Sequence, residues 1–480
     1  MKKKIKKIKK TKSIKLNYIY NVSYQILTLI TPLITAPYLS RVLKVEGIGI
    51  YSYTASIVTY FVMFAALGTI NYGNREISYL QNDRQNRSIV FWEIEFLSIG
   101  SVLCCLAAYS FFILFINHKY TSLFLVQAFT IITVATDISW LLQGMEEFGK
   151  IVSRNVVFKI LNILFIFIFV KSPNDLLIYV GGLCLLELAS NLSIWFYVPQ
   201  YINRPNFKQL HPIRHLKPTI ALFIPTIAST IYINLDKTML NEITGSPIEN
   251  GYYEQAFKIY KVALSVVTAL GTVMLPRIGK CFSEGKTNEV KKLLYKSYRF
   301  IWLIGCPMCC GLIGVSRNFC PWFFGHGYDK VPYILMIQSV LLIIVGLSNV
   351  TGVQYLITTK REYLLTRSVC IGAIANFIMN LILIPKFYSY GAAVASVLSE
   401  LLITIMQFYF VRNEIDLKSV LKSSHKYIIA SLTMLIFLLL EDNYLPINFV
   451  GTVILVISGC AVYLLMLIVL KDEMLKELIP

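Results

Sequence analysis

The chain has 480 residues, of which 56% are hydrophobic and only 15% are charged. Soluble domains average about 25% charged residues, so a water-soluble protein of this length would lack the charge to cover its surface. The apolar residues also come in long blocks, such as 156–170, 331–345 and 450–470. With their flanks, many blocks reach the ~20 residues that cross a membrane as a helix. A soluble enzyme, a nucleic-acid-binding domain and a disordered chain are excluded, and an all-α polytopic membrane protein is predicted.

The first predicted segment, residues 1–16, is a basic tail. The chain has a formal net charge of +19, and nine of its first fifteen residues are lysine. Such a run before a membrane span fits a cytoplasmic tail on anionic lipid, at about 1 kcal/mol per basic residue. The apolar stretch that follows is longer than a signal-peptide core and lacks a clear cleavage site, which predicts an uncleaved first helix. The basic charge therefore indicates a membrane partner and no nucleic acid.

Apolar runs bounded by charges, prolines and glycines predict about fourteen transmembrane helices. The predicted spans are 17–40, 46–73, 89–116, 121–144, 152–171, 175–198, 218–240, 251–276, 298–316, 331–357, 363–385, 389–411, 427–441 and 446–470. With a cytoplasmic N-terminus, thirty-four of the 45 basic residues fall in or beside inner segments and seven fall outside. The positive-inside rule thus predicts that both termini are cytoplasmic. No segment outside the spans is long enough for a folded domain, which favours a transporter over an enzyme.

Short matches at an offset of about 202 residues indicate an internal repeat. Gly49-Ile-Tyr51 precedes Gly251-Tyr-Tyr253 by 202 residues, and Arg75 precedes Arg277 by the same distance. Six predicted spans separate the copies, so both have the same orientation in the membrane. This predicts two parallel six-helix lobes, 17–198 and 218–411, with a central site between them and a two-helix appendix at 427–470.

Ionisable residues within spans are costly, and they commonly face a partner or a wet cavity. Glu254, Lys258 and Lys261 lie on one stripe of the span 251–276, which favours a cavity face. The alternative is a buried Glu254–Lys258 pair that serves packing alone. Asp236 and Lys237 lie near the outer end of span 218–240. Two interpretations are equally favoured: both are site residues, or they form an ion pair at the membrane interface.

Further acidic residues occur inside the other predicted spans. Glu187 and Glu400 lie at mid-depth in the last span of each lobe. They would act either as protonated hydrogen-bond donors between helices or as proton carriers. Asp137 and Lys159 are placed where they would pair with each other. Glu93 and Glu95, by contrast, are expected to lie at the membrane interface.

Tyrosine is abundant, at 30 residues, and several tyrosines lie well inside spans. Their rings suit stacking against sugars, and the alternative is a core aromatic with a satisfied hydroxyl. A cavity with cations, carboxyls and tyrosines suggests an anionic, partly carbohydrate cargo. Neither the ten cysteines nor the two histidines around 211–215 form a convincing metal site, so no metal is expected. The tyrosines in question are Tyr53, Tyr60, Tyr253 and Tyr260.

Several motifs in this sequence resemble those of bacterial polysaccharide flippases, the Wzx-like branch of the MATE-related MOP exporter superfamily. The resemblance covers most of residues 15–410. The matching motifs are Ala36-Pro-Tyr-Leu-Ser-Arg41, Gly49-Ile-Tyr51, Ala66-Leu-Gly68-Thr-Ile-Asn71, Asp137-Ile-Ser-Trp140, Leu235-Asp236-Lys237, Gly251-Tyr-Tyr253-Glu254, Pro276-Arg277 and Tyr390-Gly391.

The resemblance implies two six-helix bundles in a V, with alternating access and no catalytic residues. It implies a cargo of O-antigen, capsule or exopolysaccharide repeat units on undecaprenyl pyrophosphate, moved across the cytoplasmic (inner) membrane, with a glycan polymerase as a further partner. It also implies coupling to an ion gradient, H⁺ or Na⁺, and no other cofactor. On this reading the pyrophosphate is attracted by Arg41, Lys159, Lys237, Lys258 and Lys261, and the four tyrosines line the glycan path. The candidate coupling residues are Asp137, Glu187, Asp236, Glu254 and Glu400.

Three alternatives belong to other functions. A lipid II exporter would carry the same pyrophosphate-lipid head. A multidrug exporter would favour a cavity dominated by carboxylates, which the lysines of span 251–276 oppose. A membrane glycan polymerase would need a large external loop or an acidic motif in an aqueous loop, and neither is visible.

Overall fold

The computed structural model describes residues 14–116, 119–472 and 474, and the side chains of these except 14–26 and 224–225. Within these ranges the chain is helical and has no β-strand, which confirms the predicted all-α class. Residues 1–13 of the predicted basic tail lie outside the described residues. The helices are α1 (Ile14–Ala66), α2 (Thr69–Tyr79), α3 (Arg84–Phe115), α4 (Thr121–Thr136), α5 (Ser139–Gly144), α6 (Phe148–Phe169), α7 (Leu176–Trp195), α8 (Val198–Tyr201), α9 (Leu216–Thr244), α10 (Pro247–Ser283), α11 (Thr287–Phe324), α12 (Val331–Ser339), α13 (Leu341–Ser348), the π-helix η4 (Asn349–Ile357), α14 (Glu362–Phe410), α15 (Leu417–Lys422), α16 (His425–Glu441) and α17 (Phe449–Val469), with short 3₁₀ turns η1 (Pro173–Asp175), η2 (Phe207–Gln209), η3 (Pro212–His215) and η5 (Asp442–Tyr444).

Eleven helical segments in the described part of the chain are long and apolar enough to cross a membrane, or twelve when the bent α9 counts as one span. The protein is therefore a multi-pass membrane protein. Two helices are too long for a single crossing: α1 has 53 residues and α14 has 49. At 1.5 Å per residue these measure about 80 and 74 Å, against a hydrocarbon core of ~30 Å.

Both long helices contain a break. The backbone leaves helical geometry at Lys44 (φ 58°, ψ 176°) in α1 and at Tyr388 (φ 53°, ψ −129°) in α14. Charged residues surround Lys44, and Pro385, which has no backbone N–H to donate, precedes Tyr388. Each break falls between two predicted spans, at 41–45 and 386–388. The total of fourteen spans stays a prediction.

The described residues divide into two compact units. The first unit comprises residues up to Thr35, Phe61–Lys171 and Leu177–Ile224. The second unit comprises Ala36–Tyr60, Ser172–Leu176 and the chain from Pro225 onward. The lobes expected at 17–198 and 218–411 stay a prediction, as does the appendix at 427–470.

The first unit packs α2, α3, α5 and α6 around a buried aromatic and aliphatic core. The Phe91 and Trp140 rings lie 5.3 Å apart at their centroids, and Trp140 is 2% exposed. Gly73 of α2 lies directly against this indole, because a Cβ there would come within 2.5 Å of the ring. The tight contact explains why α2 and the short helix α5 pack together.

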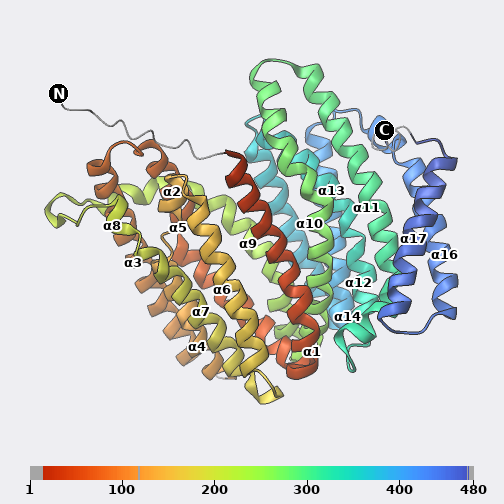
Figure 1. The fold of residues 1–480 in the computed structure, drawn as a ribbon, viewed down its shortest axis with the longest axis horizontal. Helices are drawn as coiled ribbons and strands as arrows, with labels where there is room; N and C mark the ends of the chain where they lie inside the picture. The colour runs from red at the N-terminus through yellow and green to blue at the C-terminus, as the bar shows by residue number, and fades with distance from the viewer. Residues whose placement is uncertain (1–13, 117–118, 473, 475–480) are drawn as a thin grey trace, which may run out of the picture. The chain divides into compact units, whose positions relative to one another are not determined.

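In the second unit, α11 forms the central packing surface for α10, α12, α16 and α17 (Figure 1). The two C-terminal helices α16 and α17, drawn in dark blue, lie side by side and pack on each other. Tyr463 of α17 donates a hydrogen bond to the Leu303 carbonyl of α11 at 2.8 Å. The predicted spans 427–441 and 446–470 thus coincide with helices that are part of this unit.

The sequence matches at an offset of 202 residues meet in space within the second unit. A Cβ on Gly49 of α1 would lie 1.7 Å from the Pro247 carbonyl oxygen of α10. A Cβ on Gly251 of α10 would lie 2.2 Å from the Val45 carbonyl oxygen of α1. Val45 and Pro247 are themselves 202 residues apart, so the two contacts are reciprocal. Only glycine allows the two backbones to approach this closely.

Candidate functional site

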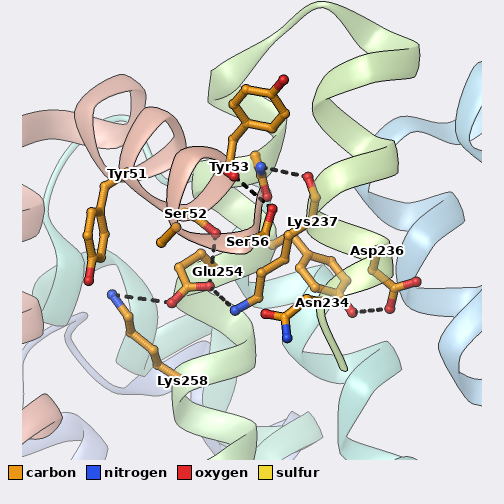
Figure 2. Close-up of polar contacts among 12 residues, drawn as sticks. Tyr51, Ser52, Tyr53, Ser56, Asn234, Asp236, Lys237, Glu254 and Lys258 are labelled. Atoms are coloured by element: carbon orange, nitrogen blue, oxygen red, sulfur yellow. Dashed lines mark hydrogen bonds and ion pairs between the residues drawn. The ribbon is translucent and has the colours of Figure 1, made fainter. Parts of the chain in front are cut away.

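The candidate site is formed by α10 and by those parts of α9 and α1 that belong to the second unit, from Pro225 onward in α9 and up to Tyr60 in α1. Ser246 and Pro247 begin α10 only two residues after α9 ends, so the two helices form a hairpin. Consecutive residues on a helix point about 100° apart. Asp236 and Lys237 therefore face different surroundings, and Figure 2 shows the two side chains diverging from α9.

Lys237, Glu254 and Lys258 form one buried charged cluster. The Lys237 Nζ lies 2.8 Å from Glu254 Oε2, and the Lys258 Nζ lies 3.7 Å from Glu254 Oε1. Ser52 of α1 donates a hydrogen bond to the same carboxylate at 3.1 Å. Figure 2 shows the two ammonium groups on opposite sides of the Glu254 carboxylate. Both lysines thus share one negative charge, which leaves an excess of positive charge.

Lys261 adds a third cation one turn further along α10. Its Nζ lies 5.1 Å from the centroid of the Phe257 ring, and the Lys237 Nζ lies 4.9 Å from the same ring. The structure shows no carboxylate within 4.0 Å of Lys261 among the described residues. Phe257 is therefore within cation–π range of two lysines from different helices.

Asp236 is held by neutral hydrogen-bond donors. Its Oδ1 accepts hydrogen bonds from the Asn376 and Asn380 side-chain amides at 3.0 and 2.7 Å. Its Oδ2 accepts from the Tyr253 and Ser396 hydroxyls at 2.6 and 2.5 Å. The buried Asn380 Oδ1 has no hydrogen-bond partner. A half-turn of the two amides would add amide oxygens to the carboxylate and hydroxyl, a ligand set that suits a hard cation.

A cavity of about 380 Å³ lies inside the second unit and joins several of the predicted site residues. Its wall is formed by α9, α10, α13, η4 and α14, and Glu400 accepts a hydrogen bond from Tyr232 on this wall. A π-helix such as η4 commonly occurs at functional sites. The predicted site residues that line the cavity are Asp236, Tyr253, Tyr260, Lys261 and Glu400.

The four predicted glycan-path tyrosines are largely inside the fold. Tyr53 and Tyr253 are each 2% exposed, and Tyr260 is 4% exposed. The Tyr53 hydroxyl donates to Glu242. The Tyr60 hydroxyl lies 3.1 Å from Thr238 Oγ1. Tyr53 and Tyr253 have the geometry of core tyrosines with satisfied hydroxyls, and the glycan-path role stays a prediction.

Arg41 lies apart from the lysine cluster, at the start of the break in α1. Its guanidinium donates to the Pro37 carbonyl at 2.9 Å and to the Trp322 carbonyl near the end of α11. The side chain is exposed. Its role in attracting a pyrophosphate stays a prediction.

The remaining candidates, Asp137, Lys159 and Glu187, belong to the first unit. The expected pair of Asp137 and Lys159 is wrong, because Asp137 instead accepts the Ser139 backbone N–H at 2.9 Å and the described residues show no ion pair between the two. Lys159 of α6 interacts electrostatically with Glu187 of α7. Glu93 and Glu95 are buried in the protein, at 0% and 2% exposed, and the position expected for them at the membrane interface stays a prediction.

Glu93 is buried because a short segment provides enough donors to satisfy it. The carboxylate accepts the His211 backbone N–H at 2.7 Å, the Arg214 Nη2 at 2.5 Å and the His215 Nε2 at 2.8 Å. The two histidines that resembled zinc ligands in spacing thus bind a carboxylate. The residues described contain no group of three His, Cys, Asp or Glu placed to hold a metal ion.

Sequence reasoning missed the partners of Asp236 and of Tyr53. Asn376 and Asn380 are four residues apart in an apolar stretch, so they share one helix face, and this spacing was a usable signal. Glu242 gave no such signal, because it lies at the end of its span among other polar residues.

Comparison with known proteins gives a consistent result. A family model described as polysaccharide biosynthesis protein matches residues 14–282. A relative in Escherichia coli (strain K12), a putative O-antigen transporter, is 24% identical over 409 residues, covering 84% of this chain and 97% of the relative. A probable low-salt glycan biosynthesis flippase of Haloferax volcanii, Agl15, is 23% identical over 283 residues, 58% of each chain.

Solved structures with the same fold include two transporter types. The lipid II flippase MurJ in an inward closed conformation superposes with a TM-score of 0.74 at 16% identity, over 96% of this chain and all of the other. An inward-facing multidrug resistance MATE transporter of the MOP superfamily gives a TM-score of 0.60 at 13% identity, over 82% of this chain and 99% of the other. At these identities the likeness establishes the MATE-like and MurJ-like fold alone.

Proposed function

The chain belongs to the polysaccharide biosynthesis protein family, and from this premise we propose that it flips lipid-linked glycan units across a membrane. The cargo we propose is an oligosaccharide repeat unit on undecaprenyl pyrophosphate, moved across the cytoplasmic membrane by alternating access. The relatives named as transporters and flippases support a transport function without catalysis.

The observation that carries the proposal is a group of three lysines from two helices inside the membrane-spanning part of the second unit. Lys237 and Lys258 share the one Glu254 carboxylate, and Lys261 lies on the cavity wall, where it interacts electrostatically with Glu400. Two lysines that share one carboxylate leave positive charge that an anionic ligand can use. A doubly ionised pyrophosphate ester supplies acceptor oxygens for several ammonium groups at once. Cationic drugs would be repelled, whereas lipid II, with the same headgroup chemistry, is the alternative cargo.

The direct test replaces two of the lysines. The double substitution Lys258→Gln and Lys261→Gln should lower export of surface glycan at least about tenfold, which corresponds to about 1.4 kcal/mol of lost binding. Lys280→Gln on the same helix α10 is the matched control, because its side chain is 77% exposed and its ion pair with Glu284, at 3.9 Å, lies at the surface. Normal export by the double variant at normal membrane levels would contradict the role of these lysines. Accumulation of lipid II instead of the glycan precursor would favour the alternative cargo.

We also propose that a coupling ion, H⁺ or Na⁺, binds at Asp236. The supporting features are the buried carboxylate, its four neutral donors and the unpaired Asn380 oxygen. Transport by Asp236→Asn in proteoliposomes should lose its response to an imposed ion gradient and keep basal cargo binding. Separate pH and Na⁺ gradients identify the ion, and a wild-type protein that ignores both would overturn the coupling.

The location and partners belong to the same proposal. Both termini are proposed to be cytoplasmic, with the basic tail on anionic lipid and a glycan polymerase receiving the flipped unit. Accessibility of single cysteines at the two ends of the chain to a membrane-impermeant reagent tests the orientation.

A further inference from the structure

Glu254 has the position that an anionic ligand would take in this cluster. Its carboxylate lies between the ammonium groups of Lys237 and Lys258, which belong to different helices. Carboxylate and phosphate oxygens are interchangeable acceptors for such groups. Any anion that enters the cluster must therefore compete with Glu254 for the same donors.

The contacts of Glu254 are of an exchangeable kind. Lysine is a point charge on a flexible stem, so it can change its anion without rearrangement of the backbone. The Lys237 and Lys258 side chains keep 14% and 23% of their surface exposed, whereas the Glu254 side chain keeps 11%. All three side chains keep part of their surface exposed, so the cluster is not closed off from a ligand.

Resting on the proposed function, we propose that Glu254 stands in for the cargo phosphate in the empty protein and that anion loading displaces it and adds a proton to it. The charged and titratable groups facing Glu254 are Lys237 from α9 and Lys258 from α10, with the neutral Ser52 hydroxyl from α1. When the anion takes both ammonium groups, the Ser52 hydroxyl is the remaining hydrogen-bond donor that the described residues show for this carboxylate. A buried carboxylate without a cation is strongly unfavourable, so it takes up a proton from water.

The charge balance follows from these steps. The phosphate oxygens form ion pairs with the two lysines, the Glu254–lysine pairs break, and one proton from solvent joins the Glu254 carboxylate. Ser52 keeps a hydrogen bond to the resulting carboxylic acid. Each anion that binds is therefore accompanied by about one proton, and Glu254 links the cargo to the proton concentration.

The test is calorimetric titration of the purified full-length protein with inorganic pyrophosphate, in two buffers of different ionisation enthalpy at one pH. Glu254→Gln should bind pyrophosphate at least about tenfold more tightly, because no carboxylate competes. The wild-type protein should take up about one more proton per pyrophosphate than Glu254→Gln. Glu254→Asp keeps the charge and should keep that proton uptake, and Lys280→Gln serves as the unrelated control.

The outcomes separate this inference from the proposed function. Equal affinity and equal proton uptake in wild-type and Glu254→Gln protein would overturn the inference. A loss of affinity in Glu254→Gln, with a normal melting temperature, would also overturn it, because it would make Glu254 a support for the lysines and not their competitor. If Lys258→Gln binds pyrophosphate as well as the wild type, the lysine site of the proposed function fails instead.

Discussion

Each unit of the molecule buries a glutamate among cations, but the two glutamates are held in different ways. Glu93 in the first unit is bound by His211, Arg214 and His215, all from one five-residue stretch. One donor is a backbone N–H, and the arginine binds through both Nε and Nη2 at 3.0 and 2.5 Å. Glu254 in the second unit is bound by side chains from three different helices, and both cations are lysines.

This difference separates an ion cluster of fixed geometry from one whose partners can exchange. A backbone N–H and a planar guanidinium fix the direction of the carboxylate, so the Glu93 cluster fastens η3 to α3. The His215 Nδ1 extends it to the Tyr72 hydroxyl of α2 at 2.7 Å. Lysines offer no fixed geometry and can exchange partners. Buried acids within spans therefore differ in role according to their donors, even where their burial is alike.

The largest effect is expected from removal of the Glu93 charge. Glu93→Gln leaves Arg214 and His215 without an anion, and breaking a buried ion pair costs about 3–5 kcal/mol. Because the Arg214 side chain is 52% exposed and can hydrate, we expect a loss of about 3 kcal/mol in the free energy of unfolding. Denaturant titration in detergent measures it. Glu254→Gln also leaves two largely buried lysines without their anion, so a loss of the same order is expected there. An unchanged free energy of unfolding in Glu93→Gln would show that the Glu93 cluster does not stabilise the fold.

The fold could be predicted from the sequence wherever the length of an apolar run is enough to determine the structure. The breaks at Lys44 and Tyr388 lie between predicted spans because charges and proline interrupt the apolar runs there. The reciprocal contact of Gly49 and Gly251 joins two motifs that the repeat had already paired. The repeat could not predict which segments are in contact, because a glycine indicates a close backbone approach but does not identify the segment that approaches it.

The site was only partly readable, for a related reason. Helical spacing placed Glu254, Lys258 and Lys261 on one stripe, because positions three and four apart share a face. The link to Lys237 and the amide partners of Asp236 depends on packing between helices distant in sequence. The partners of Glu93 could not be predicted either, because they lie about 120 residues further along the chain.

A second prediction concerns the close contact of α1 and α10 at Gly49 and Gly251, called here the glycine crossing. It tests whether the second unit tolerates a change there better than the first unit tolerates one at Glu93. Gly251→Ala would force a Cβ to within 2.2 Å of the Val45 carbonyl oxygen, so the α1–α10 contact must separate. Overpacking of this kind costs about 1–3 kcal/mol in the free energy of unfolding. Gly279→Ala on the same helix is the matched control, because its nearest new neighbour, Thr358 Cγ2, lies at 3.9 Å. Similar stability of both variants would show that the crossing is loose.

The smallest effect concerns a third glutamate, Glu414, which lies outside the spans and is held by an arginine in the manner of Glu93. Arg361 binds both its oxygens at 2.6 and 2.8 Å, and the Arg361 guanidinium holds the pKa of Glu414 below its usual value. The Glu414 side chain is 38% exposed, so solvent screens the pair and Glu414→Gln should cost no more than about 1 kcal/mol at pH 7.

The pH dependence of this loss has a definite sign. Because the pKa is lower in the folded state, Glu414 stabilises the fold above the pKa of about 4.3 that glutamate has in the unfolded chain. This stabilisation declines as the pH falls and is gone below the lowered pKa of the folded state. Unfolding titrations of wild-type and Glu414→Gln protein between pH 7 and 3 should therefore converge at the acid end. A constant difference across that range would mean that the hydrogen-bond geometry of Glu414, and not its charge, stabilises the fold. In that case the presence of an arginine partner would not be enough to tell a fixed ion pair from an exchangeable one.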